Sequence, residues 1–311
     1  MKVKYVCAQP TSIYYAWQVE VMLNNFIDVG IELQNVEIVC WKVNNQIPTE
    51  WRKLQSHFEN VNFSFYDDTR SKRNYISSIR PNILKQHFIN FPELEKDAIF
   101  YHDCDIVFTK SVDWSKFLDD DKWYGSDTRF YIAHSYIVGK GNDIMKKMCE
   151  IADISESVIK ENELNCIGAQ YLMKGIDWRF WADVENTCEK LFSEITAMNN
   201  QKKMENPSYH ELQIWCADMW AVLWHGWKMG KKTICHPDFE FSWATSTETD
   251  WNKLNIFHNA GVVSGSEGLF YKGEWMAKLP YNQELVLRDG TASKKYWELI
   301  QETAKKSCLN K

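Results

Sequence analysis

Two acidic residues, Asp103 and Asp105, flank Cys104 directly after an apolar run that is typical of a buried strand. Burying an unpaired carboxylate is unfavourable, so both acids are expected at the end of that strand, where they can meet a divalent cation. Carboxylate oxygens suit Mg²⁺ or Mn²⁺, and such a cation can hold a diphosphate and neutralise a leaving group. An Asp-x-Asp pair also occurs in ordinary acidic turns, so the surrounding sequence has to decide between the two interpretations.

Alternating strand and helix patterns lead up to the two aspartates. Apolar runs predict strands and amphipathic segments predict the helices between them: strands over 3–8, 36–43, 61–66 and 98–101, and helices over 13–29, 48–58 and 77–88. This alternation is typical of an α/β fold with a mostly parallel central sheet flanked by helices. Such sheets bind ligands at the carboxyl ends of their strands, which is where Asp103 and Asp105 are expected.

The chain beyond Asp105 has a mixed pattern. We expect a strand over 131–138, helices over 142–153, 178–198 and 209–227, and a short strand over 256–258. A turn at Asp289-Gly290 precedes a helical tail. No repeat, low-complexity stretch or linker is evident, so a single domain over 1–311 is predicted. Within it we expect a nucleotide-binding half over 1–108, a sugar and acceptor half over 109–265, and a C-terminal helical extension over 266–311.

The order of these motifs resembles glycosyltransferases of the GT-A fold, notably the glycogenin-like families. Arg80 lies at a helix start before the aspartate motif, and His258 lies in the late segment Asn-Ile-Phe-His-Asn-Ala-Gly at 255–261. The resemblance implies that Asp103, Asp105 and His258 bind Mn²⁺ (or Mg²⁺) on the donor diphosphate. It also implies that Arg80 and Asp103 contact the donor. A surface salt bridge is the alternative for Arg80, and a structural role is the alternative for His258.

Two further segments fit the same layout. The segment 165–171 resembles the Gly-containing loop that faces donor sugar and acceptor, which implies that Gln170 hydrogen-bonds sugar hydroxyls; a tight turn requiring Gly168 is the alternative. The aromatic-rich segment with Asp218 resembles, more distantly, the late acidic helix of plant hydroxyproline arabinosyltransferases and peptidyl-serine galactosyltransferases. Asp218 would then bind hydroxyls or act as a base with a raised pKa, unless it pairs with a lysine.

The turn after the first strand occupies the position where GT-A enzymes seat the nucleotide base. Gln9 and Thr11 are expected to contact the uracil edge, and Tyr14 or Tyr15 to stack on the base.

The composition is that of a globular protein with a large core, at 45% hydrophobic and 25% charged residues. Trp residues concentrate from Trp178 onward; a Trp ring can stack on a pyranose, although packing in a core is more frequent. The net charge of −6 argues against a general nucleic-acid or membrane-surface binder. Nine cysteines without a C-x-x-C pair indicate reduced thiols, and no apolar stretch predicts a membrane span. We therefore expect the cytoplasm of a bacterium or of a virus-infected cell.

The predicted activity is metal-dependent transfer of a hexose or pentose from a nucleotide diphosphate, with UDP as the expected nucleotide, to a hydroxyl. The acceptor would be a glycan, a protein or another hydroxyl compound. A modified DNA base is less favoured, because the chain is acidic overall. One alternative is a metal-dependent phosphoester hydrolase, which would require further His or Asp ligands. Another is a non-catalytic glycan-binding protein, which would require no metal.

Overall fold

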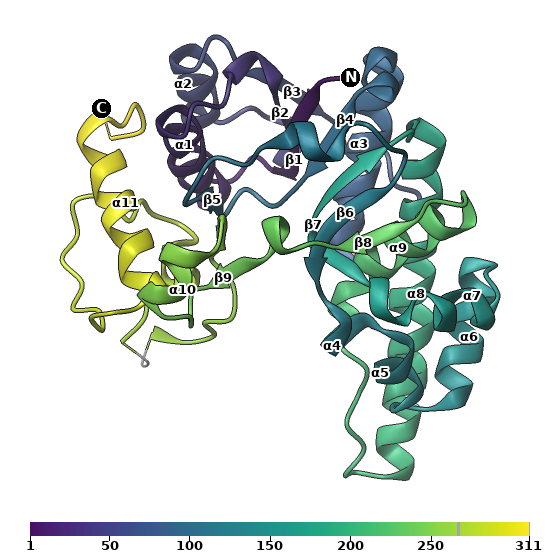
Figure 1. The fold of residues 1–311 in the computed structure, drawn as a ribbon. Helices are drawn as coiled ribbons and strands as arrows, with labels where there is room; N and C mark the ends of the chain where they lie inside the picture. The colour runs from purple at the N-terminus through teal and green to yellow at the C-terminus, as the bar shows by residue number, and fades with distance from the viewer. Residues whose placement is uncertain (266–267, 311) are drawn as a thin grey trace. The chain divides into compact units, whose positions relative to one another are not determined.

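The computed structural model describes residues 1–265 and 268–310 (Figure 1). Residues 266, 267 and 311, which belong to the predicted C-terminal extension, lie outside this part. The chain forms two compact units that are interleaved in sequence. The Asp103 unit comprises Val3–Asp67, Tyr101–Lys116 and Pro237–Lys311; the Asp218 unit comprises Met1–Lys2, Asp68–Phe100 and Phe117–His236.

Parallel strands in the order β3-β2-β1 form the first sheet of the Asp103 unit: β1 (Val3–Pro10), β2 (Val36–Trp41) and β3 (Asn62–Tyr66). The central strand β2 is buried along nearly its whole length, as is usual for a parallel strand covered on both faces. Helix α1 (Ile13–Asp28) connects β1 to β2, and α2 (Thr49–His57) connects β2 to β3 (Figure 1).

A second, short sheet of the Asp103 unit follows the aspartate motif. Strand β10 (Ile256–His258) lies at its centre, antiparallel to β5 (Ile106–Phe108) and parallel to β9 (Phe241–Trp243). The buried Asn25 of α1 accepts a hydrogen bond from the Phe108 N–H at 2.7 Å and donates one to the Phe108 carbonyl at 2.9 Å. This side chain therefore fixes β5 against α1.

Two more helices belong to this part of the unit, α10 (Glu248–Lys253) and α11 (Ala292–Lys306). Helix α11 packs on α1 and α10. It follows Gly290, whose φ of 71° is the left-handed conformation that a turn at Asp289-Gly290 requires, as predicted.

The Asp218 unit has strands in the order β4-β7-β6-β8, with β6 antiparallel to β7 and parallel to β8: β4 (Ala98–Tyr101), β6 (Trp123–Asp127), β7 (Ile167–Lys174) and β8 (Thr233–Cys235). The long helix α8 packs on three others, as Figure 1 shows: α8 (Trp178–Glu205), α3 (Ile79–Asn90), α6 (Asn142–Ala152) and α9 (Ala217–Lys228). Trp181, Trp220 and Trp224 are fully buried, so much of the Trp-rich region is core.

Close approach of α9 to β6 requires a residue without a side chain. A Cβ atom at Gly226 would lie 2.5 Å from the ring of Trp123, which is itself fully buried. Only glycine fits there without moving the Trp ring.

The predicted strand over 131–138 is wrong. This segment forms two short helices, α4 (Arg129–Ile132) and α5 (His134–Val138). The buried residues Ala133 and Ile137 are four positions apart, and the Ile137 N–H donates to the Ala133 carbonyl at 3.2 Å. The aromatic and β-branched composition suggested a strand, whereas the spacing of the buried residues is helical.

Other boundaries also differ from expectation. Helix α9 begins at Ala217, after a 3₁₀ turn over Ile214–Cys216, and not near residue 209. The predicted loop over 165–171 is largely strand β7. Most of the paired strands are nevertheless parallel and helices flank them, so the predicted α/β class is confirmed. None of the described helices has the length and apolar character needed to cross a membrane.

Candidate active site

The three predicted metal ligands lie together in the Asp103 unit. Nε2 of His258 is 3.3 Å from Oδ1 of Asp105 and 3.5 Å from Oδ2 of Asp103. One ligand atom from each of the three residues lies within 4.8 Å of the other two. Neighbouring ligands of an octahedral cation with bonds of about 2.1 Å are about 3 Å apart, so this spacing needs little change to hold such a cation.

Strand pairing explains how residues far apart in sequence come together. In the β5–β10 ladder His258 lies opposite Ile106, the residue that follows Asp105. The Asn259 N–H also donates to the Asp105 carbonyl at 3.0 Å. The backbone on both sides of the cluster is therefore fixed before any ligand binds.

Lys272, which was not predicted from the sequence, adds a positive charge to the cluster. Its ammonium group donates a hydrogen bond to Oδ2 of Asp105. Burial would raise the pKa of Asp105, but the charges of Lys272 and His258 outweigh burial and hold this pKa well below its usual range. Burial would likewise lower the pKa of Lys272, and the Asp105 carboxylate raises it instead. The buried Asp105 and the half-buried Lys272 therefore form an ion pair.

The chemistry of the cluster fits a divalent cation. Asp105 and His258 are almost fully buried, whereas the Asp103 side chain is 30% exposed, so a ligand can approach from its side. Two carboxylates and an imidazole are suitable ligands for Mn²⁺, and Nε2 is the ring nitrogen that faces the carboxylates. These residues could hold the cation that the sequence predicts.

The residues expected to contact the base lie in the same unit. Gln9 is buried and its amide donates to Sγ of Cys40 at 3.5 Å. The hydroxyl of Thr11 accepts a hydrogen bond from the Val43 N–H at 3.0 Å. Tyr14 lies near the cluster: burial raises the pKa of its hydroxyl, and the Lys272 charge offsets part of this effect. Contacts of Gln9 and Thr11 with uracil stay a prediction.

Arg80 and Asp218 were predicted separately and form an ion pair in the Asp218 unit. Nη1 of Arg80 is 3.8 Å from Oδ2 of Asp218, so an arginine pairs with this carboxylate. The Tyr75 hydroxyl donates to Oδ1 of Asp218 at 2.7 Å. Burial and then the Asp218 charge raise the pKa of Tyr75, which keeps the hydroxyl protonated. The Arg80–Asp218 ion pair and the Tyr75 hydroxyl can together donate and accept hydrogen bonds at a partly exposed surface.

Gln170 lies inside β7 of the Asp218 unit and not in a loop. Its side chain is fully buried, and Ala169 before it has a φ of 61° at the irregularity in the β6–β7 pairing. A Cβ atom on Gly168 would lie 2.5 Å from the Met219 side chain, so this glycine serves close packing. The contact of Gln170 with a sugar stays a prediction.

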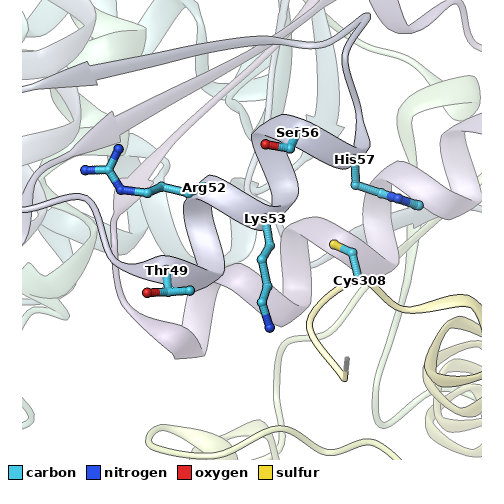
Figure 2. Close-up of a pocket in the computed structure, with 6 residues that line it drawn as sticks. All are labelled: Thr49, Arg52, Lys53, Ser56, His57 and Cys308. Carbon is cyan, nitrogen blue, oxygen red and sulfur yellow. The ribbon is translucent and has the colours of Figure 1, made fainter.

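A separate surface depression lies on the Asp103 unit. It has a volume of about 520 Å³. Its lining residues, five from α2 and one near the C-terminus, are labelled in Figure 2: Thr49, Arg52, Lys53, Ser56, His57 and Cys308. None of these residues belongs to the cluster of Asp103, Asp105 and His258.

Several solved structures to which the chain is similar are glycosyltransferases, the class that the sequence resemblance named. The bifunctional glycosyltransferase WbbM is 11% identical with a TM-score of 0.48, over 84% of this chain and 46% of WbbM, so the chain spans less than half of that protein. A glycosyltransferase involved in glycosylation of the major capsid of PBCV-1 is 9% identical with a TM-score of 0.40, over 85% of this chain and 95% of the other.

The galactosyltransferase LgtC, solved with donor and acceptor sugar analogues, is 12% identical with a TM-score of 0.38, over 96% of this chain and 95% of LgtC. No protein-family model and no curated protein matches the chain. Because the similarities are distant, the functional assignment rests on the chemistry of the chain's own residues.

Proposed function

We propose that the protein is a metal-dependent glycosyltransferase that moves a sugar from a nucleotide diphosphate, with UDP as the nucleotide, to a hydroxyl of a glycan, protein or other acceptor. The convergence of Asp103, Asp105 and His258 carries this proposal. Mn²⁺ or Mg²⁺ held there would neutralise the diphosphate as the glycosyl bond breaks.

The remaining residues of the Asp103 unit would bind and orient the donor. Lys272 lies beside Asp105 and would place a second positive charge near the diphosphate. Positive charge fixed in advance where negative charge develops lowers the barrier without reorganisation. Gln9 and Thr11 would contact the base. In the Asp218 unit, Arg80 would add positive charge for the donor, Asp218 would bind or activate hydroxyls, and Gln170 would hydrogen-bond sugar hydroxyls.

The two rival functions have less support. A phosphoester hydrolase with a larger metal centre needs additional ligands, and within residues 1–265 and 268–310 the cluster of Asp103, Asp105 and His258 is the one group with metal-binding spacing. A glycan-binding protein without a metal leaves the convergence of two carboxylates on one imidazole unexplained.

We further propose that residues 1–311 form one catalytic domain. Within it we propose the nucleotide-binding half, the sugar and acceptor half and the C-terminal helical extension that the sequence predicts. We also propose that the protein acts in the cytoplasm of a bacterium or of a virus-infected cell. Buried thiols such as Cys104, Cys166 and Cys188 suit a reducing compartment. The acidic net charge of −6 leaves DNA with a modified base as the less favoured acceptor.

A panel of nucleotide sugars incubated with Mn²⁺ tests the proposal. We expect the release of nucleoside diphosphate from one UDP-sugar, its loss in EDTA, and its recovery when Mn²⁺ is restored. The proposal is rejected if no nucleotide sugar is turned over and none raises the melting temperature. Turnover of p-nitrophenyl phosphate instead would favour the hydrolase.

A further inference from the structure

An exposed aromatic cluster lies on the Asp218 unit. Trp215 is 59% exposed and Phe130 is 69% exposed, whereas Trp181 and Trp220 of the same unit are fully buried. The Trp215 ring stacks on Tyr131 with centroids 6.2 Å apart and an angle of 20°, and Tyr131 contacts Phe130 at 4.6 Å. We call the exposed Phe130 and Trp215, together with the buried Tyr131 that contacts both rings, the aromatic platform. Large exposed aromatic surface is uncommon unless it binds something.

The platform is held in place before any ligand arrives. The single Tyr75 hydroxyl proton is shared between the Trp215 carbonyl at 2.5 Å and Oδ1 of Asp218 at 2.7 Å, and Tyr75 itself stacks on Phe192 at 4.8 Å. The Gln213 N–H donates to the Tyr136 hydroxyl at 3.3 Å, which fixes the chain before Trp215. A ring ordered in this way loses little conformational entropy on binding.

Charged groups are linked to the platform through the backbone carbonyl of Trp215. The Tyr75 hydroxyl that contacts the Trp215 carbonyl also contacts Asp218, which in turn pairs with Arg80. An aromatic face next to a carboxylate and a guanidinium matches a pyranose, which has an apolar C–H face and hydroxyls at its rim. A protein partner would pack against the apolar rings but would gain less binding energy from the Asp218–Arg80 ion pair.

We propose that the aromatic platform binds a pyranose ring of the acceptor glycan, with the ring stacked on Trp215 and its hydroxyls bonded to Asp218. This inference rests on the proposed glycosyltransferase function and adds that the acceptor is a sugar. Trp215 would determine acceptor binding and not donor binding.

Saturation-transfer NMR on the full chain tests this proposal with methyl glycosides of galactose, glucose, mannose and xylose. We expect transfer to the ring C–H protons of at least one glycoside. Trp215→Ala should weaken that binding at least tenfold, Trp215→Phe should restore part of it, and Trp178→Ala should leave it unchanged. Trp178 is a suitable control because it is 37% exposed in the same unit.

UDP and Mn²⁺ binding, measured on the same variants, separates the two proposals. We expect unchanged UDP affinity in Trp215→Ala, which also reports that the variant is folded. If the natural protein does not bind UDP, the proposed transferase function is rejected, and the aromatic platform would then be a glycan-binding surface. The platform proposal is overturned if no glycoside shows transfer, if Trp215→Ala binds as tightly as the natural protein, or if Trp215→Ala instead abolishes self-association.

Discussion

Asp105 remains a carboxylate although it is nearly enclosed, because Lys272 and His258 compensate for its burial. Asp105→Asn keeps the shape and removes the charge. We expect the affinity for UDP in the presence of Mn²⁺ to fall by about 100-fold or more, since loss of a ligand should exceed the effect of a supporting residue. Isothermal titration calorimetry measures the affinity, and the melting temperature reports whether the fold survives.

Asp289→Asn is the matched control, because Asp289 is an exposed aspartate of the same unit that pairs with Lys294. Equal UDP affinity in Asp105→Asn and Asp289→Asn would contradict the role of Asp105 as a metal ligand.

Lys272 competes with a bound cation for the Asp105 carboxylate. Lys272→Met removes this competing charge and keeps a long side chain. We expect Mn²⁺ alone to bind about tenfold more tightly and UDP with Mn²⁺ to bind more weakly, because the charge near the diphosphate is lost. Mn²⁺ binding can be followed by electron paramagnetic resonance. Weaker Mn²⁺ binding in the variant would show that Lys272 supports the site instead of competing.

The contact between α8 and α9 should be sensitive to acid. Thr187 of α8 and Nε2 of His225 on α9 are 2.8 Å apart, and burial lowers the pKa of His225 to about 4. The unfolded chain takes up this proton at about pH 6.5, before the folded protein does. Neutral His225 therefore contributes to the free energy of unfolding above about pH 6.5. This contribution, about 3 kcal/mol, is lost as the pH falls toward 4.

His225→Gln removes the titrating group from this interface. We expect the melting temperature of the variant to change less between pH 7.5 and pH 4.5 than that of the natural protein. His57→Gln, at an exposed position, serves as the control. The same pH dependence in all three proteins would exclude a contribution from His225.

Helices and strands with long, regular patterns were predictable from the sequence, as was the short strand over 256–258, whereas the two short helices within 129–138 were not. The strands β1, β2 and β4 are apolar runs, β3 alternates polar and aromatic residues, and α1 is long enough for its pattern to be unambiguous. The segment over 131–138 is too short for its spacing to outweigh its β-branched and aromatic composition. Such short helices depend on neighbours in the folded chain, which local sequence does not reveal.

Within the Asp103 unit the C-terminal segment is attached to α1 through a buried carboxylate. Glu20 is fully buried and accepts hydrogen bonds from the Tyr281 hydroxyl at 2.6 Å, the Ser307 hydroxyl at 2.8 Å and the Cys308 N–H at 2.7 Å. A buried carboxylate is stable only while such donors are present. These three hydrogen bonds therefore hold Tyr281 and the two residues that follow α11, Ser307 and Cys308, close to α1.

Deletion of residues 307–311 removes two of the three donors to Glu20. We expect a loss of about 2–4 kcal/mol in stability, because the carboxylate stays buried with one donor. Urea unfolding monitored by fluorescence measures the change. Deletion of residues 310–311 alone keeps Ser307 and Cys308 and should have little effect; an equal loss in both deletions would exclude Glu20 as the cause.

The candidate site was only partly predictable from the sequence. Asp103, Asp105 and His258 carry recognisable chemistry in recognisable segments, and the β5–β10 register brings them together. Lys272 was missed because a single lysine outside a motif is indistinguishable from a surface lysine. The pairing of Arg80 with Asp218 was also missed, since it depends on how α3 and α9 are placed in three dimensions.

The Asp103 unit is assembled from the early, middle and late parts of the chain. A nascent polypeptide therefore exposes its two aspartates long before the ribosome has synthesised His258 and Lys272. Premature termination after residue 250 would yield a product with carboxylates but without the imidazole opposite them. Translation thus delays assembly of the metal cluster until most of the chain has been made.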